Sequence, residues 1–108
     1  DEVVFSSFNG PWLVDLKLHF PKAIVAFISD DRKIDSVRIA TSLRAVQLNL
    51  SQRVAGKEIV RKAQEEGLEV NVWPVNKERA MRKFVAMGVD GIITDKPELL
   101  LRTISEKA

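Results

Sequence analysis

The sequence predicts an α/β fold in which helices cover a parallel β-sheet. Two observations support this prediction. Short apolar runs rich in β-branched residues alternate with longer stretches of helical spacing, about five times in units of roughly twenty residues. The short runs are also apolar on both faces, which is typical of parallel strands that are buried on both sides.

Five apolar runs are expected to form the strands. They are residues 3–5, 23–28, 45–48, 70–73 and 92–93. Each run is far shorter than a typical helix, and each is bounded by polar residues, glycine or proline.

Two of the stretches between these runs have a clear helical pattern. In residues 57–66 the apolar side chains fall on one face, and Gly67 follows as the glycine that commonly ends a helix. Residues 77–87 repeat this pattern, with Asn76 as the expected N-cap and Gly88 after the helix.

Two further stretches are expected to be helical on weaker patterns. Residues 10–20 contain spaced leucines and end at Pro21. Residues 30–42 begin with the acidic pair Asp30–Asp31, whose expected role is to cap that helix. Binding of a cation is the alternative role of this pair.

The closing stretch, GVDGIITDKPE, runs from Gly88 to Glu98. A tight turn is expected to lead into a short buried strand, and Asp95 and Glu98 are spaced as a capping box for a last helix with Pro97 in its first turn. The alternative is that Thr94 or Asp95 also lines a site, because ligands of parallel α/β proteins bind where the strands end.

Composition limits the classes of partner. The 108 residues are enough for one domain, and the formal net charge of +2 gives little reason to expect nucleic acid as a partner. No apolar run approaches the roughly 18 residues of a membrane span. The sequence contains no cysteine and does not start like a signal peptide, so a cytoplasmic location is expected.

Polar and aromatic side chains follow the predicted strands. Ser7 and Phe8 follow the first strand, Gln47 and Asn49 lie at the third, and Trp73 ends the fourth. These groups can hold a small polar ligand, with the aromatic rings packing on its carbon skeleton. For Trp73, packing without a ligand is an equally weighted alternative.

These side chains do not form a catalytic set. His19 is the single histidine, it lies near the end of a predicted helix, and its expected role is structural. No group of residues has metal-ligand spacing, and no glycine-rich phosphate loop is present.

Three ordered segments resemble the carboxyl-terminal part of the glycerophosphodiester phosphodiesterase family. They are VVFSSF (residues 3–8), EEGLEVNVWPVN (65–76) and GVDGIITDKPELL (88–100). The resemblance covers nearly the whole chain. One departure is Pro74, which stands where the family usually has threonine, so a hydroxyl contact expected there is missing.

The resemblance implies that residues 1–108 are a single partial-barrel domain, the carboxyl-terminal part of a TIM (β/α)8 barrel. Such barrels have about 250 residues. The parent enzyme would hydrolyse glycerophosphodiesters to glycerol phosphate and an alcohol. In the family, a divalent metal and acid–base histidines are held by amino-terminal segments (His-Arg-Gly, Glu-Asn, Glu-x-Asp and His-Asp), and none of them occurs here. The isolated chain is therefore expected to be inactive.

The resemblance also implies four substrate-binding residues: Ser7, Phe8, Trp73 and Thr94. The serine and the phenylalanine would stand at the mouth of the barrel, and the tryptophan would pack against the glycerol moiety. The threonine would have a supporting role at the last strand end. No catalytic residue and no metal ligand is expected in this chain.

Two alternatives remain at this stage. Five βα units also fit a flavodoxin-like doubly wound parallel sheet that serves as a non-catalytic binding or scaffold domain, and strand order distinguishes the two. A different phosphate-handling barrel is the other, which the three ordered segments disfavour. The expected macromolecular partner is the missing amino-terminal half of the barrel, or a second copy of the chain, because open sheet edges favour association.

Overall fold

The computed structural model describes residues 3–107, with side chains described for residues 3–105. Within this range, five strands and five helices alternate strictly along the chain, which confirms the predicted α/β class. In order they are β1 Val4–Ser7, α1 Gly10–His19, β2 Ile24–Ser29, α2 Ser36–Ser42, β3 Gln47–Ser51, α3 Lys57–Glu65, β4 Glu69–Trp73, α4 Glu78–Met87, β5 Gly91–Ile92 and α5 Pro97–Lys107.

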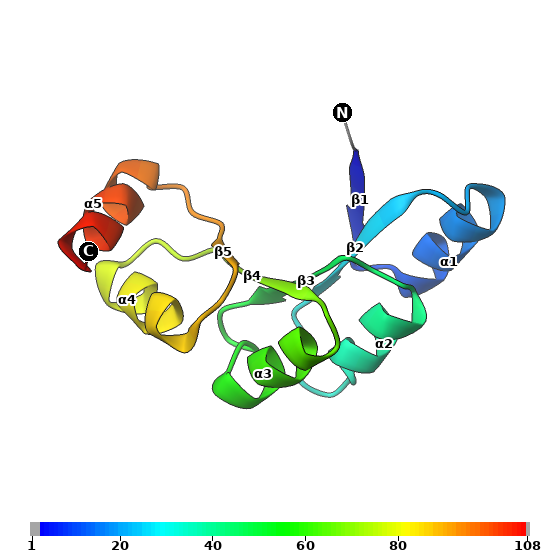
Figure 1. Cartoon of the computed structure of the whole chain (residues 1–108), viewed down its shortest axis with the longest axis horizontal. Coiled ribbons are helices and arrows are strands. Elements are labelled where there is room, and N and C mark those ends of the chain that lie inside the picture. Colours follow the sequence, from blue (N-terminus) through cyan, green and yellow to red (C-terminus); the bar gives the residue numbers. More distant parts are fainter. Residues whose placement is uncertain (1–2, 108) are drawn as a thin grey trace.

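The strands form one parallel sheet whose spatial order is the sequence order, β1-β2-β3-β4-β5. Figure 1 shows the strands following one another along an arc, with α1, α2, α3 and α4 on one side of it. A doubly wound sheet would reverse its strand order at a switch point. The sequential order therefore excludes the flavodoxin-like alternative and matches the way a (β/α)8 barrel is built.

One face of the sheet packs against the helices and forms the core. The registers place Phe27, Leu48 and Val70 side by side on this face, and each is at most 3% exposed. Helix side chains including Leu13 and Val60 complete the same apolar cluster. Burial of these aliphatic and aromatic groups is the main driving force that holds the helices on the sheet.

The opposite face of the sheet is more polar than the sequence predicted. Side chains alternate between the two faces of a strand, so Gln47 and Asn49 of β3 and Asn71 of β4 lie on the face away from the core. The expectation that the strands are apolar on both faces is wrong for β3 and β4. We call this surface, made by every second residue of each strand, the inner face.

The helix α2 begins later than predicted. Its N-cap is Asp35, whose carboxylate accepts a hydrogen bond of 3.1 Å from the Arg38 backbone N–H. Asp30 and Asp31 lie before the helix and do not cap it. Asp31 instead closes a short turn by accepting from the Lys33 N–H at 2.8 Å.

The predicted glycine ends of two helices are confirmed. Gly67 and Gly88 follow α3 and α4 with φ values of +84° and +85°, the left-handed region that L side chains avoid. The expected N-cap of α4 is wrong, since the cap position is Lys77, with no side-chain hydrogen bond to the helix. The amide of Asn76 is used elsewhere, at the end of β5.

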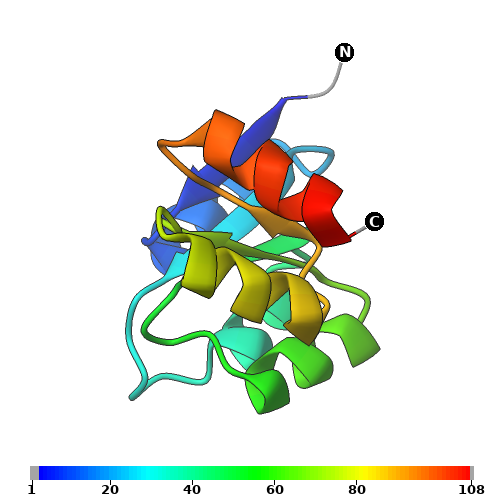
Figure 2. The ribbon, with the colours of Figure 1, turned by 90° about the vertical axis from the view of Figure 1, so that its left-hand side faces the viewer.

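The last helix packs beside α4, as the view from the α5 side shows (Figure 2). Pro97 is its first residue, as predicted. The capping-box expectation is not met, because the cap position is Lys96, whose backbone oxygen accepts from the Leu100 N–H at 3.2 Å. The Asp95 carboxylate accepts a hydrogen bond from Asn76 Nδ2 at 3.2 Å. Within the described part of the chain, no helix combines the length and the apolar character needed to cross a bilayer.

Candidate functional site

A concave site of about 320 Å³ lies on the inner face at the carboxyl ends of the strands. Its lining is mostly apolar, with one amide side chain, and comprises Phe8, Ile28, Asn49, Trp73, Pro74 and Ile93. All five strands, or the residues directly after them, contribute. The carboxyl end of a parallel sheet is where α/β proteins bind small ligands, so we call this hollow the strand-end cavity.

Two of the predicted residues meet in this cavity. The rings of Phe8 and Trp73 are arranged edge to face, with centroids 5.8 Å apart and an angle of 87° between their planes. The Trp73 indole Nε1–H donates to the backbone oxygen of Asn49 at 3.2 Å, which fixes the plane of the indole. The pair forms an aromatic wall that can pack against the carbon atoms of a small polar molecule.

Ser7 is not brought into the cavity. Its partner in the β1–β2 register is Phe27, so its side chain is on the core side of the sheet. The Ser7 hydroxyl accepts a hydrogen bond of 3.0 Å from the Asn9 N–H, and Asn9 in turn caps α1 through Trp12 N. The serine thus orders the turn that leads from β1 into α1 and leaves Phe8 on the inner face.

Thr94 also lies outside the cavity, at the end of β5. Its hydroxyl donates to Asn76 Oδ1 at 2.9 Å and accepts from the Lys96 N–H at 3.0 Å. The same Asn76 oxygen accepts from the Asp95 N–H at 2.8 Å. These bonds tie the segment after β4 to the segment after β5, and they place Ile93 beside Pro74 in the cavity wall.

Two asparagines of the inner face, Asn49 and Asn71, are not among the four substrate-binding residues expected from the sequence. Asn49 lines the cavity, and its Oδ1 accepts a hydrogen bond of 2.8 Å from Asn71 Nδ2. Gly91 of β5 leaves room for the Asn71 side chain, because a β-carbon there would overlap Asn71 Oδ1. The signal that finds them is polar residues at every second position of otherwise apolar strands, as in Gln47-Leu48-Asn49.

A charged cluster joins the loops after β2 and β3. Arg53 Nε contacts Asp30 Oδ1 at 2.7 Å, and Arg32 Nε donates to the Arg53 backbone oxygen at 2.9 Å. The nearby Ser51 hydroxyl and then the Arg53 guanidinium lower the pKa of Asp30. The Ser51 hydroxyl is buried and makes no hydrogen bond within the described residues, whereas the Arg53 guanidinium contacts the Asp30 carboxylate directly.

The cluster and the cavity do not make a catalytic set. Among the residues whose side chains are described, no three acidic, histidine or cysteine side chains are grouped as metal ligands. His19 Nδ1 lies 2.9 Å from the Asp15 backbone oxygen at the end of α1, as its expected structural role requires. The described residues therefore do not supply the set of ligands that a metal centre needs.

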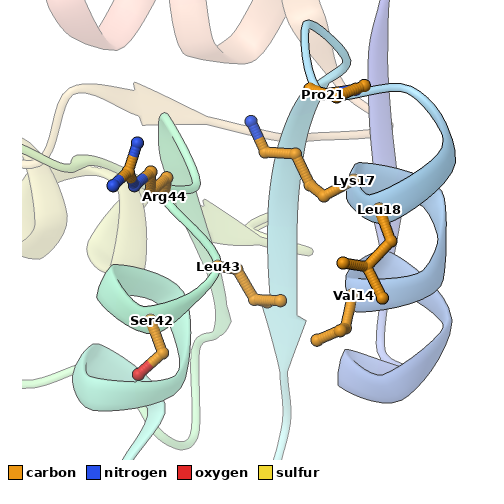
Figure 3. Close-up of a pocket in the computed structure, with 7 residues that line it drawn as sticks. All are labelled: Val14, Lys17, Leu18, Pro21, Ser42, Leu43 and Arg44. Carbon is orange, nitrogen blue, oxygen red and sulfur yellow. The ribbon is translucent and has the colours of Figure 1, made fainter.

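A second hollow, of about 290 Å³, lies between the end of α1 and the end of α2 (Figure 3). Figure 3 shows Val14 and Leu43 facing each other across it, with the basic side chain of Lys17 on the α1 side and that of Arg44 on the α2 side. In βα units the helix ends lie beside the amino ends of the following strands. This hollow therefore lies at the amino-terminal end of the strands, which in (β/α) barrels contributes to stability.

The sequential parallel sheet and its strand-end cavity define an α/β protein with the strand order found in (β/α) barrels. The sequence model described as the glycerophosphoryl diester phosphodiesterase family matches residues 1–99, and the chain belongs to that family.

Relatives of known sequence or structure agree with this assignment. A glycerophosphodiester phosphodiesterase of Caldanaerobacter subterraneus subsp. tengcongensis is 28% identical over 104 residues, 96% of this chain and 43% of that protein. A phosphodiesterase of Oleispira antarctica, solved in complex with the product sn-glycerol-3-phosphate, superposes with a TM-score of 0.83 at 22% identity, over 96% of this chain and 42% of that one. A glycerophosphodiester phosphodiesterase of Parabacteroides distasonis superposes with a TM-score of 0.77 at 25% identity, over 95% of this chain and 43% of that one. The chain spans less than half the length of these three relatives.

Proposed function

We propose that this chain is the carboxyl-terminal part of a (β/α)8 barrel that hydrolyses glycerophosphodiesters to glycerol phosphate and an alcohol. The observation that carries the proposal is the aromatic strand-end cavity on a sequential parallel sheet, in a chain of this family. The share of the relatives that the chain covers supports a partial barrel. The presence of sn-glycerol-3-phosphate in the Oleispira structure supports glycerol phosphate as the product.

In this proposal the chain shapes the substrate pocket. Phe8 and Trp73 pack against the carbon atoms of the glycerol moiety, because their rings form one wall of the cavity. Ser7 and Thr94 do not contact the substrate in this proposal. They position the cavity lining through their hydrogen bonds with Asn9 and Asn76. The cavity lining has no charged side chain. The phosphate would therefore be bound mainly outside this lining.

The divalent metal and the acid–base groups belong, in this proposal, to the amino-terminal part of the barrel. The described side chains offer no metal-binding group, and the only histidine of the chain is occupied at the end of α1. The isolated 108-residue chain is expected to bind the glycerol moiety of the substrate without hydrolysing the phosphodiester.

The same amino-terminal part would cover surfaces that the chain leaves open. β1 and β5 each pair on one side only within the described residues. Helix α1 buries Leu13 alone, while Trp12 and Leu18 are exposed. Unpaired strand edges and exposed apolar side chains favour association, so self-association of the chain is expected when its other half is absent.

The test compares the isolated chain with a completed barrel. The chain is joined behind the amino-terminal part of the Caldanaerobacter relative, and the release of glycerol phosphate from glycerophosphodiesters is measured with divalent metal. We expect turnover by the joined protein, none by the isolated chain, and a loss of kcat/KM on Trp73→Ala in the joined protein. Turnover by the purified isolated chain would contradict the proposal.

A matched control keeps folding separate from activity. Phe20 is an exposed aromatic residue outside the cavity, so Phe20→Ala in the joined protein should leave kcat/KM unchanged. Circular dichroism and size-exclusion chromatography show whether the joined protein has folded. A folded, monomeric joined protein without phosphodiesterase activity would favour the non-catalytic binding domain instead.

A further inference from the structure

Asn49 is a polar residue in an unusual position, in the middle strand of the sheet and at the base of the strand-end cavity. It is 8% exposed, although the residues on either side of it along β3 are leucines buried in the core. A buried amide costs free energy unless its donors and acceptors find partners. The Asn49 side-chain oxygen and nitrogen therefore each need a hydrogen-bond partner.

The acceptor of the Asn49 side chain is already used. Oδ1 accepts the 2.8 Å hydrogen bond from Asn71 Nδ2, and the Asn49 backbone oxygen accepts from Trp73 Nε1. Gly91 helps to hold the donor in place, because only a residue without a β-carbon leaves room there for the Asn71 amide oxygen. In this arrangement the Asn49 Oδ1 faces Asn71, and the Nδ2 group is the donor available to the cavity.

The cavity around this donor selects the kind of group that it can bind. The other lining side chains are aromatic, aliphatic or proline, and none is charged. A single neutral donor beside the Phe8–Trp73 wall suits a hydroxyl group on a short carbon skeleton. A phosphate would leave several charged oxygens without partners in the same space.

We propose that Asn49 Nδ2 donates a hydrogen bond to a hydroxyl of the glyceryl group of the substrate, with Asn71 as the residue that positions it. The inference rests on the proposed function for the identity of the substrate. It adds a residue that recognises a hydroxyl group of the substrate through a hydrogen bond, whereas the aromatic wall contacts only carbon atoms.

The first experiment measures binding to the 108-residue chain by NMR, with sn-glycerol 3-phosphate as the probe. We expect saturable shifts of the Asn49 side-chain amide signals. Affinity should fall about tenfold for Asn49→Leu, or for a probe that lacks the bonded hydroxyl, which is the loss typical of one hydrogen bond. The two deoxy probes are 3-hydroxypropyl phosphate and propane-1,2-diol 1-phosphate.

Gln47→Leu is the matched control. Gln47 is also an amide on the inner face of β3, but it lies at the amino end of the strand and contacts Glu69 at 3.4 Å. This variant should bind the probe as the wild type does. If Asn49→Leu does not fold, the deoxy probes give the same comparison with the wild-type protein.

Kinetics of the joined protein separate this inference from the proposed function. The wild type should prefer a glycerophosphodiester to its deoxy analogue, and Asn49→Leu and Asn71→Leu should lose that preference in kcat/KM. Equal use of both substrates by an active wild type would overturn the role of Asn49 and leave the phosphodiesterase assignment standing. The inference would also be overturned if the Asn49 amide signals of the wild type did not move. An inactive joined protein whose Asn49 signals shift with the probe would overturn only the phosphodiesterase assignment.

Discussion

The ring of Phe8 stands nearly perpendicular to the ring of Trp73, with centroids 5.8 Å apart. Edge-to-face pairs contribute about 0.5–1.5 kcal/mol beyond the area that they bury. We expect a double-mutant cycle with Phe8→Leu and Trp73→Leu, measured by urea unfolding, to give a coupling free energy in this range. Phe20→Leu paired with Trp73→Leu is the control and should be additive. Additive effects of the first pair would contradict the ring contact.

Gly91→Ala should destabilise the protein by about 1–3 kcal/mol, the usual cost of an overpacked site. The added β-carbon would overlap Asn71 Oδ1 on the neighbouring strand. Gly10→Ala is the control, since a β-carbon at that helix position would meet Ile39 and Phe27 at ordinary contact distances of 3.7 and 3.9 Å. Shortening the neighbour with Asn71→Ala should remove most of the cost of Gly91→Ala. Equal unfolding free energies for the two single glycine variants would show that the strands can move apart.

Asn76→Ala should lower the free energy of unfolding by about 0.5–1.5 kcal/mol, because two partly or fully exposed donors lose their shared acceptor and turn to water instead. Those donors are the Thr94 hydroxyl and the Asp95 N–H. The protection of the Asp95 amide against hydrogen exchange should fall in the variant. If exchange at Asp95 did not change, the link between the ends of β4 and β5 would not have the strength that its geometry implies.

Lys77→Ser should stabilise the protein, by about 0.5–1 kcal/mol. Lys77 occupies the N-cap of α4 in an extended conformation, and its side chain makes no capping hydrogen bond. Serine would supply the missing oxygen. Lys77→Ala removes the same charge at the helix N-terminus without adding a cap, so the effect of the charge is common to both variants. The difference between them in thermal unfolding isolates the cap itself.

Asp30 should make stability depend on pH in the acid range. Its pKa is lowered in the folded protein by Ser51 and Arg53, so its ionised form is favoured by folding. The stabilising contribution is complete above the unfolded-state pKa of about 3.9, and it is lost as the pH falls through the lowered folded-state value. Urea unfolding of the wild type and of Asp30→Asn should therefore differ at neutral pH and converge in acid. The side chain is 43% exposed, so the difference should also shrink with added salt. A constant difference down to pH 2 would contradict this account.

Periodicity was sufficient to predict the α/β class and the position of every strand to within a few residues. The reason is that residues such as Leu48, Leu50, Val70 and Val72 are buried against the helices, and this burial requires apolar residues at regular positions along each strand. The helix ends at Gly67 and Gly88 were predictable as well, because the left-handed backbone conformation after a helix favours glycine at that position.

The helix caps and the cavity contacts were less predictable, because they depend on which strands lie side by side. Asn76 has the right residue type for a cap, yet its amide is drawn to Thr94 and Asp95, eighteen and nineteen positions later. Ser7 and Phe8 are neighbours in sequence, but the two-residue repeat of a strand sends them to opposite faces. Motif resemblance identified the segment that contributes to the cavity without assigning its side chains to a face.

The order of the strands also bears on how the chain acquires its structure. Each strand pairs only with the strands that precede and follow it along the chain, so each pairing closes a loop of one helix and its turns. The paired residues are 20 to 22 positions apart in every pairing, and the entropy cost of closing a loop grows only slowly with its length. The β1–α1–β2 unit ends at Ser29, so all the residues of its pairing are present before the later strands have been synthesised.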